Sequence, residues 1–390
     1  MGAPSMPRRS LIAFAAVVTH ICLGSVYAWS VFVPALTAQT GWTKPQVTWA
    51  FSFAIAALGL TAALASRRVA ALGPRRAVAL SALCFGLGLL GAGLALKVHS
   101  LLLLYVTYGL IGGIGLGLGY VPPVTTLLRW FPDRKGLATG LAVGGFGIGA
   151  LLGSFLGEAL LARTTVGGAF VGMGVLYAPV IFLASRCLHL PEVPEAASPE
   201  QGEASPLKDR RFVLIWCAFF LNIASGILLI ALARPMLEEA GRGWLPAVTA
   251  VAVMGLFNGL GRLGWSSLSD RVGRLRVWGL MFALQGLAFL GLAQGAGATV
   301  LALGLWLIAS CYGGGFALCP ALVADTFGPV RGPRAYGLAL TAWSAAALVS
   351  PPLGAFLREA LGSYRAVLVA GAAASLLGIA LVMALGRKPR

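Results

Sequence analysis

A single arginine stands inside one of the apolar, glycine-rich stretches of the chain. Between Ala252 and Ser266 only Arg262 is charged, and Asn258 lies one helical turn before it. Burial cannot neutralise a guanidinium, and placing it near the centre of a bilayer costs roughly 2.5 to 3.5 kcal/mol. Arg262 therefore either faces a protein-lined cavity and binds an anion, or extends its side chain to the headgroups. Asn258 favours the first interpretation, because an extended arginine needs no polar neighbour deeper in the membrane.

Further groups that could serve such a site lie in other apolar stretches. His20 and Tyr27 fall in the first one. His20 could relay a proton, since histidine titrates near neutral pH, or it could be a helix-packing residue hydrogen-bonded to a neighbouring backbone carbonyl. Tyr120 follows a glycine-rich run and offers a phenol that can donate to a carboxylate. Tyr312 and Phe316 share a helix face, which fits either a ligand wall or core packing.

Together these residues describe a small cavity with one cation, two phenols, one amide and apolar walls. One arginine can neutralise a carboxylate and hold it through two hydrogen bonds. A dicarboxylate would leave its second charge desolvated, at a cost of several kcal/mol. Phosphate esters and large drugs would call for more cations or a larger, more acidic cavity. The ligand class that fits is a small monocarboxylate.

The composition is that of a membrane protein with many spans. The 390 residues are 58% hydrophobic and only 11% charged, which is too apolar for a soluble domain of this size. The net charge of +17 does not indicate nucleic-acid binding, because the cations lie in short loops between apolar stretches. The six cysteines have no metal-ligand spacing, so neither a metal site nor disulfides are expected. No nucleophile–base or metal constellation indicates an enzyme, and no cofactor is expected.

Windows of about 20 apolar residues predict an all-α membrane protein with twelve transmembrane helices. The spans are 10–37, 46–66, 75–95, 100–129, 136–161, 167–187, 211–238, 245–268, 274–293, 298–324, 334–358 and 364–386. The longest interruption is rich in proline and glutamate and separates six spans from six. This predicts an N-terminal half over 1–187, a linker over 188–210 and a C-terminal half over 211–390.

The distribution of cations predicts the orientation. With both termini on one side, 21 of the 29 Lys and Arg residues fall on that side and seven on the other; Arg262 is the remaining one. The excess of cations in short loops marks the cytoplasmic side. We therefore expect a multi-pass protein of the cell (inner) membrane with both termini in the cytoplasm.

The two halves repeat each other. Residues 153–160 (GSFLGEAL) match residues 354–361 (GAFLREAL) at an offset of 201, and the same offset relates the Gly-Leu-Ala of 136–138 to that of 337–339. A duplicated six-helix unit places a binding cavity between the halves near the membrane midplane, with the halves rocking around it. The chain is thus expected to form two pseudo-symmetric six-helix halves.

Three motifs carry a resemblance to the major facilitator superfamily, in the neighbourhood of oxalate–formate antiporters and monocarboxylate transporters. Residues 130–140 (WFPDRKGLATG) are similar to that family's loop between spans 4 and 5. Residues 268–274 (LSDRVGR) resemble the facilitator loop between spans 8 and 9, whereas the first-half counterpart has Ala70 where aspartate is usual. Residues 256–259 (LFNG), followed by Arg262, resemble span 8 of the oxalate carrier, whose arginine binds carboxylate.

The resemblance implies the facilitator fold and a binding pocket. Carried over residue by residue, that pocket falls on Tyr27, Tyr120, Phe146, Arg262, Tyr312 and Phe316. Two positions depart from the family. Trp343 stands where the oxalate carrier has a second cation, a lysine, which argues against oxalate. Asn258 stands where animal monocarboxylate transporters have an aspartate implicated in proton coupling, and it cannot titrate.

We expect a secondary transporter of small monocarboxylates, of the L-lactate or pyruvate type, working as a proton symporter by alternating access. Arg262 would bind the carboxylate with Asn258 orienting it, Tyr120 and Tyr312 would donate hydrogen bonds, and Phe146 and Phe316 would line the wall. The proton route is either His20 or a proton shared by substrate and pocket. The alternatives are a formate or oxalate antiporter and a carboxylate sensor that does not transport. The expected partners are the carboxylate, protons and the lipid bilayer, with the chain a monomer.

Overall fold

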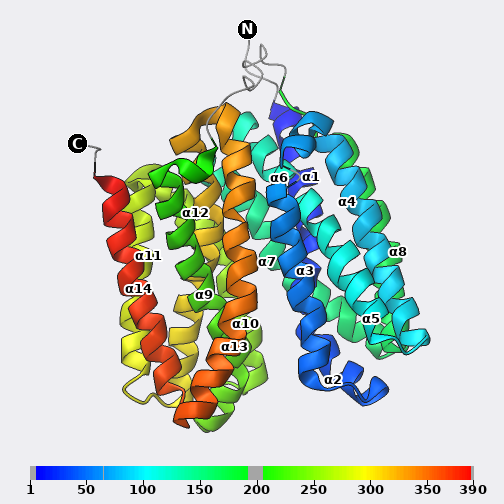
Figure 1. Ribbon diagram of the computed structural model, residues 1–390, viewed down its shortest axis with the longest axis vertical. Coiled ribbons are helices and arrows are strands. Elements are labelled where there is room, and N and C mark those ends of the chain that lie inside the picture. Colours follow the sequence, from blue (N-terminus) through cyan, green and yellow to red (C-terminus); the bar gives the residue numbers. More distant parts are fainter. Residues whose placement is uncertain (1–5, 65, 192–204, 388–390) are drawn as a thin grey trace.

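A computed structural model describes residues 6–64, 66–191 and 205–387, and these residues are almost entirely helical. The elements up to residue 187 are α1 (Met6–Gly24), η1 (Ser25–Ala28), α2 (Trp29–Thr40), α3 (Lys44–Leu64), α4 (Ser66–Lys97), α5 (Leu101–Leu104), η2 (Tyr105–Gly112), α6 (Gly113–Trp130), α7 (Lys135–Leu161) and α8 (Val166–Cys187). Those after it are η3 (Pro206–Lys208), α9 (Arg210–Glu239), α10 (Ala247–Val272), α11 (Arg274–Leu292), α12 (Ala298–Ala339), α13 (Thr341–Leu361) and α14 (Arg365–Gly386). Figure 1 shows the two sets side by side, with both termini at one end of the bundle. We call this the termini end and the opposite one the far end.

The helices account for the twelve expected spans. Within the described residues, ten stretches are long and apolar enough to cross a membrane. One of them, Ala298–Ser350, covers the expected span 298–324 and most of 334–358, which separate at Gly328, where φ is +71°. The helix α10 is not among the ten, but it packs along α12 over its length and supplies the twelfth span. Most of the predicted linker, residues 192–204, lies outside the described residues.

The first span changes its helix type in the middle. The α-helix α1 ends at Gly24, residues 25–28 form a 3₁₀ turn, and α2 continues to Thr40. At this point α1 lies against α7: a Cβ on Gly24 would lie 2.1 Å from the carbonyl oxygen of Phe146. Glycine allows this close approach because it has no Cβ. The turn carries Tyr27, one of the predicted site residues, to the junction of the halves.

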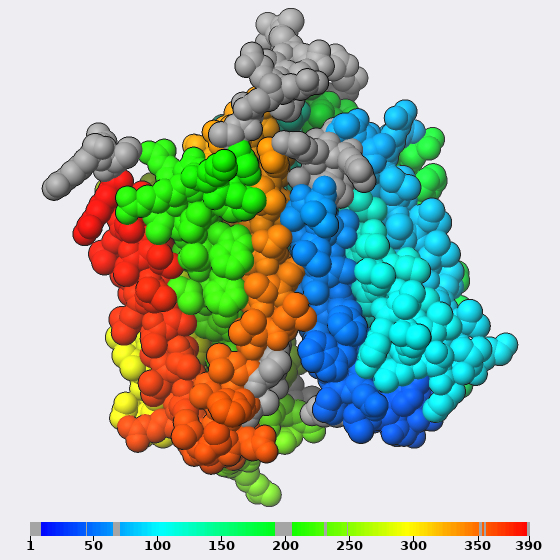
Figure 2. Space-filling model, in the orientation of Figure 1, coloured from blue at the N-terminus to red at the C-terminus, as the bar shows by residue number. Residues whose placement is uncertain are grey.

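The halves meet mainly through α7 with α10 and α3 with α13, and α12 adds contacts to α7 and α3. In the first pair, a Cβ on Gly140 would lie 2.4 Å from Oγ of Ser266. In the second, Oγ of Ser344 donates to the carbonyl oxygen of Ala56 at 3.1 Å. Figure 2 shows α3 and α13 meeting along a seam between the halves. Small residues thus bring the backbones of the two halves together, as expected for helix packing in a membrane.

Candidate functional site

Arg262 lies buried where the halves meet. Its side chain is 0% exposed, so it does not extend to the headgroups, and that interpretation of the sequence is wrong. Nε donates to Oδ1 of Asn258 at 3.0 Å, and Nη1 donates to the carbonyl oxygen of Val143, on α7 of the other half, at 3.0 Å. The guanidinium carbon lies 5.1 Å from the ring centroid of Phe316 and 5.7 Å from that of Phe146. The cation is therefore held between the two halves and between two aromatic rings.

One nitrogen of this guanidinium makes no hydrogen bond within the described residues. Nη2 of Arg262 is buried and has no hydrogen-bond partner among the described residues. A buried charged donor without a partner is unfavourable by about 1–3 kcal/mol or more. A carboxylate would satisfy it and neutralise the charge, and the two ring faces add cation–π attraction. The arrangement can hold one anionic group.

An indole ring completes the wall around the arginine. The centroid of Trp343 lies 4.7 Å from that of Phe316, 5.5 Å from Tyr120, 5.9 Å from Phe146 and 6.1 Å from Tyr27. Trp343 is 0% exposed, and its Nε1 has no hydrogen-bond partner in the described part of the chain. It therefore joins rings from both halves and carries a second unsatisfied donor.

The phenols of the site fall into two groups. The hydroxyls of Tyr27 and Tyr312 lie 3.2 Å apart and hydrogen-bond across the two halves. Because Tyr312 lies one turn nearer the far end than Phe316, this bond joins the halves on the far-end side of the arginine. The hydroxyls of Tyr120 and Tyr336 are buried and interact with each other, and neither makes a hydrogen bond to any other described residue. A ligand oxygen could compete for either hydroxyl.

His20 packs beside this group. It is fully buried, its Nδ1 lies 3.1 Å from the carbonyl oxygen of Ala16, and its ring contacts those of Tyr120 and Phe146 at 5.1 and 6.3 Å. A hydrogen bond from Nδ1 requires the proton on that nitrogen, which leaves Nε2 as an acceptor. Nε2 makes no well-formed hydrogen bond in the described structure, although the ring also interacts with the backbone of Tyr120. The contact with Ala16, one turn back in the same helix, is the neighbouring backbone carbonyl of the packing interpretation.

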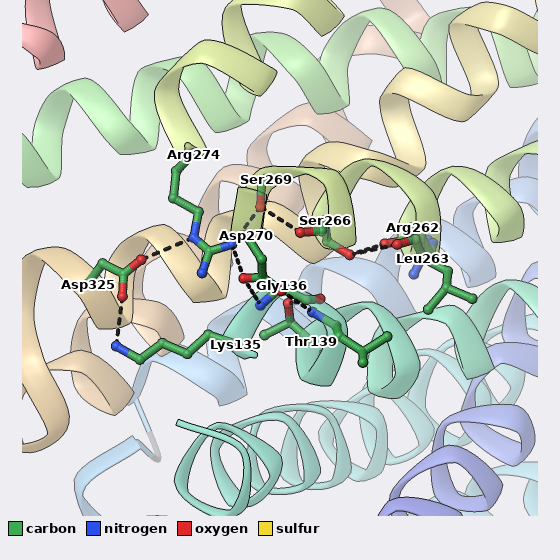
Figure 3. Close-up of polar contacts among 11 residues, drawn as sticks. Lys135, Gly136, Thr139, Arg262, Leu263, Ser266, Ser269, Asp270, Arg274 and Asp325 are labelled. Carbon is green, nitrogen blue, oxygen red and sulfur yellow. Dashed lines mark hydrogen bonds and ion pairs between the residues drawn. The ribbon is translucent and has the colours of Figure 1, made fainter. Parts of the chain in front are cut away.

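At the termini end, polar groups link the halves around Asp270 (Figure 3). Its Oδ1 accepts from the backbone N–H of Gly136 at 2.8 Å and its Oδ2 from that of Leu137 at 3.0 Å. Both amides belong to the first turn of α7, where a carboxylate is favoured by unpaired N–H groups and the helix dipole. Asp270 also pairs with Arg274 at 2.6 Å. These contacts hold the first turn of α7 against the C-terminal end of α10.

A second carboxylate extends this link. Asp325 of α12 accepts from Nζ of Lys135 at 2.7 Å and from Nε of Arg274 at 3.0 Å. Lys135 belongs to the first half, so the ion pairs cross between the halves (Figure 3). Oγ of Ser269 donates to the carbonyl oxygen of Ser266 at 2.6 Å, and Oγ of Ser266 donates to that of Arg262. The network thus continues along α10 to the buried arginine.

Comparison with known proteins decides the family. The sequence model described as Major Facilitator Superfamily matches residues 13–265 and 216–390. The chain belongs to the major facilitator superfamily. This confirms the resemblance and the fold expected from the sequence.

By their names, some relatives of this facilitator are carriers of small carboxylates. The chain is 31% identical over 341 residues to the MFS-type transporter YhjX of Escherichia coli K12, covering 85% of this chain and 83% of that one. It is 29% identical over 280 residues to the oxalate:formate antiporter of Oxalobacter formigenes, covering 70% and 67%. It is 25% identical over 442 residues to apicoplast pyruvate carrier 1 of Toxoplasma gondii, covering 84% and 79%.

Solved structures agree on the fold. The crystal structure of the transporter FucP in the outward conformation superposes with a TM-score of 0.77 at 14% sequence identity, covering 96% of this chain and 99% of that one. The human organic anion transporter MFSD10 superposes with a TM-score of 0.77 at 16% identity, covering 97% and 100%. The facilitator fold therefore extends over nearly the whole chain.

The structure brings the predicted site residues of this facilitator together. Rings and polar groups of Tyr27, Tyr120, Phe146, Tyr312, Phe316 and His20 form one connected cluster that includes Arg262 and its neighbour Asn258. No sequence pattern points to Val143, which offers only a carbonyl, or to Tyr336. Trp343 departs from the family in sequence, and in the structure it contacts four site residues. A tryptophan within a span, away from the interfaces, is the sequence signal that points to it.

Proposed function

We propose that this facilitator transports small monocarboxylates of the L-lactate or pyruvate type across the inner membrane, as a proton symporter. The observation that carries this proposal is the buried guanidinium of Arg262, with one unpaired nitrogen, at the junction of the halves. A carboxylate would pair with Nη2 and compete with the Val143 carbonyl for Nη1, which gives the two parallel bonds that arginine prefers. The name of the pyruvate carrier of Toxoplasma gondii supports this substrate class.

The surroundings of Arg262 favour a single carboxylate. The side chains that contact it in the described structure are an amide and two aromatic rings, and none is a second cation. Trp343 fills the adjoining space with an indole. A second carboxylate would therefore lose its hydration without gaining a counter-charge. The hydroxyls of Tyr120 and Tyr336 and the Nε1 of Trp343 offer neutral donors for a 2-oxo or 2-hydroxyl oxygen.

Transport would proceed by alternating access, with the termini end in the cytoplasm. In the present arrangement Arg262, Phe146 and Phe316 are all 0% exposed, so a substrate reaches the guanidinium only when the halves separate. The network around Asp270 closes one end and the Tyr27–Tyr312 bond closes the other. Breaking one closure at a time would open the site to one side of the membrane and then the other.

His20 would couple the proton. Its Nε2 is an unpaired acceptor, and its ring touches Tyr120 and Phe146, which also contact the substrate site. Asn258, beside the guanidinium, cannot titrate. His20→Gln keeps the size and a polar group but removes the titration. We expect this variant to exchange lactate across the membrane and to lose accumulation driven by a proton gradient; accumulation equal to that of the wild type would assign coupling to a proton shared by substrate and pocket.

The test of function is uptake of labelled L-lactate into proteoliposomes, with and without an inward proton gradient. Accumulation that requires the gradient and is blocked by pyruvate is the expected result. Arg262→Gln should abolish it, whereas Arg163→Gln, which alters an exposed arginine at the far end, should not. Equal uptake by the two variants would contradict the proposed role of Arg262.

The second candidate is a formate or oxalate antiporter, which the similarity to the oxalate:formate antiporter favours. It predicts lactate or formate counterflow that ignores the proton gradient. Absence of lactate movement, with counterflow of formate or oxalate in the same vesicles, would establish that alternative.

A further inference from the structure

The first half carries a groove on its outer surface between α4 and α8, which lie together along the edge of the bundle (Figure 1). Its volume is about 640 Å³. The lining is apolar apart from one arginine: Leu72, Arg76, Ala79, Leu80, Ala82, Leu83, Ala178, Pro179 and Phe182. Because these residues come from the beginning of α4 and the end of α8, the groove lies in the part of the half nearest the termini end.

The sequence explains why the two helices leave space there. Toward the far end they pack closely through glycine, since a Cβ on Gly93 would lie 2.8 Å from the carbonyl oxygen of Gly167. Gly86 lies against Ala178, where a Cβ would come within 2.7 Å. Beyond that contact the floor is made of Ala79 and Ala82, whose short side chains cannot fill the gap.

The second half has a bulky residue at the corresponding place. Aligning Gly73 with Gly273, both at positive φ just before a span, pairs Ala82 with Phe282. The ring of Phe282 lies over Gly378 of α14, where a Cβ would come within 2.4 Å of it. In the second half the ring of Phe282 thus occupies the space that Ala82 leaves open in the first half. The two halves therefore differ in the side chain at this place of the repeat.

Two guanidinium groups stand at the termini end of this groove. Arg76 lines it directly. Arg186 lies over the ring of Phe182, another lining residue, with its guanidinium carbon 5.8 Å from the centroid. Both arginines are exposed, and no carboxylate of the described residues pairs with either. An apolar groove that ends at two cations unpaired by any described carboxylate complements a molecule with a hydrocarbon chain and an anionic head.

We propose that this groove is a binding site for an anionic phospholipid. The acyl chain lies along Leu80, Leu83 and Phe182, and the phosphate is held by Arg76 and Arg186. Basic sites between membrane helices recognise anionic headgroups in this way, and arginine holds phosphate through paired hydrogen bonds. The site is separate from the substrate cluster and does not depend on which substrate is carried.

The experiment measures lipid retention by native mass spectrometry of the full-length protein. Delipidated protein receives phosphatidylglycerol or phosphatidylcholine with the same acyl chains. We expect the wild type to retain one phosphatidylglycerol preferentially, and the double variant Arg76→Gln/Arg186→Gln to lose about tenfold in that affinity. The matched control is Arg276→Gln, an exposed arginine at the position of the second half that corresponds to Arg76. It should retain the lipid as the wild type does.

A second variant tests the groove itself. Ala82→Phe introduces the residue that fills the second half, and it should reduce retention of phosphatidylglycerol while leaving both arginines in place. Equal retention of the two lipids by the wild type would overturn the proposal. So would an equal loss in the Arg276→Gln variant, because it would show that any arginine at the termini end attracts the lipid.

Discussion

Arg262 of α10 donates from Nη1 to the carbonyl oxygen of Val143 on α7 at 3.0 Å, so the cation of the second half is bonded to the backbone of the first. A carbonyl carries only a partial charge, and a carboxylate is the stronger acceptor for a guanidinium. Substrate binding would therefore exchange a contact between the halves for a contact with the substrate. This links occupancy of the site to the separation of the halves that alternating access requires.

The first prediction concerns the shape of this cation. Arg262→Lys keeps the charge, but an ammonium lacks the planar fork that reaches Asn258, Val143 and a carboxylate together. Loss of a charge-assisted hydrogen bond, about 1.5–3 kcal/mol, should weaken lactate binding roughly 10- to 100-fold. Isothermal titration of purified protein measures it, with Arg163→Lys as the control. Unchanged affinity would show that charge alone suffices at this position.

The second prediction concerns the closure at the termini end. Asp270→Asn removes the charge that accepts from two amides of α7 and pairs with Arg274. An amide oxygen can replace only part of these bonds, and we expect the closed arrangement to lose about 1–3 kcal/mol. Spin labels on cysteines at Arg129 and Val272, one in each half, should show a larger population of long distances after the native cysteines are replaced.

The control for this closure is Asp133→Asn. Asp133 contacts Arg134 at 3.9 Å within one loop, and the two side chains are 63% and 71% exposed. Such an exposed pair contributes at most about 1 kcal/mol, and it joins no part of the second half. The distance distribution should match that of the labelled parent. A shift as large as that of Asp270→Asn would contradict the role given to the network.

The parts of the site that the sequence predicts well are local in the chain. Asn258 and Arg262 stand four residues apart in a helical stretch, so their contact follows from helical geometry alone. The same holds for the edge-to-face pair Tyr312 and Phe316. The number of spans and their grouping follow from apolar length and from the internal repeat, because a bilayer admits few other structures.

The remaining contacts depend on how the halves dock. Val143 contributes a backbone carbonyl, which every residue has, so no sequence pattern marks it. Tyr27 and Tyr312 are 285 positions apart, and their bond requires both the 3₁₀ turn at 25–28 and the packing of α1 against α7. The turn contains neither proline nor glycine, so no residue within it predicts the turn from the sequence. Such features become visible only in three dimensions.

The third prediction treats the bond between Tyr27 and Tyr312 as the closure at the far end. Either Tyr27→Phe or Tyr312→Phe removes it, at about 1 kcal/mol, and leaves the rings in place. If opening at this end limits exchange, each variant should exchange lactate up to about fivefold faster than the wild type. The double variant should be no faster than the singles, since one bond is lost in every case. Additive acceleration would mean that the two phenols act separately.

The fourth prediction is a change of substrate through Trp343. Its indole packs on Phe316 at 4.7 Å and contacts rings of the first half, where a second cation would reach a second carboxylate. Trp343→Lys should therefore confer oxalate binding and weaken discrimination in favour of lactate. The added cation lies close to Arg262, so without a dianion the two charges repel each other. Oxalate should consequently raise the melting temperature of this variant and leave that of the wild type unchanged.

Trp343→Phe tests whether oxalate binding by Trp343→Lys requires the added charge or only the removal of the indole. It keeps an aromatic ring but removes Nε1, a donor without a partner in the described structure. We expect this variant to bind lactate about fivefold more weakly, because a hydrogen bond to the 2-hydroxyl contributes about 1 kcal/mol, and to bind propionate, which lacks that hydroxyl, as the wild type does. It should not bind oxalate. Oxalate binding by the phenylalanine variant would show that space, rather than the missing cation, excludes the dicarboxylate.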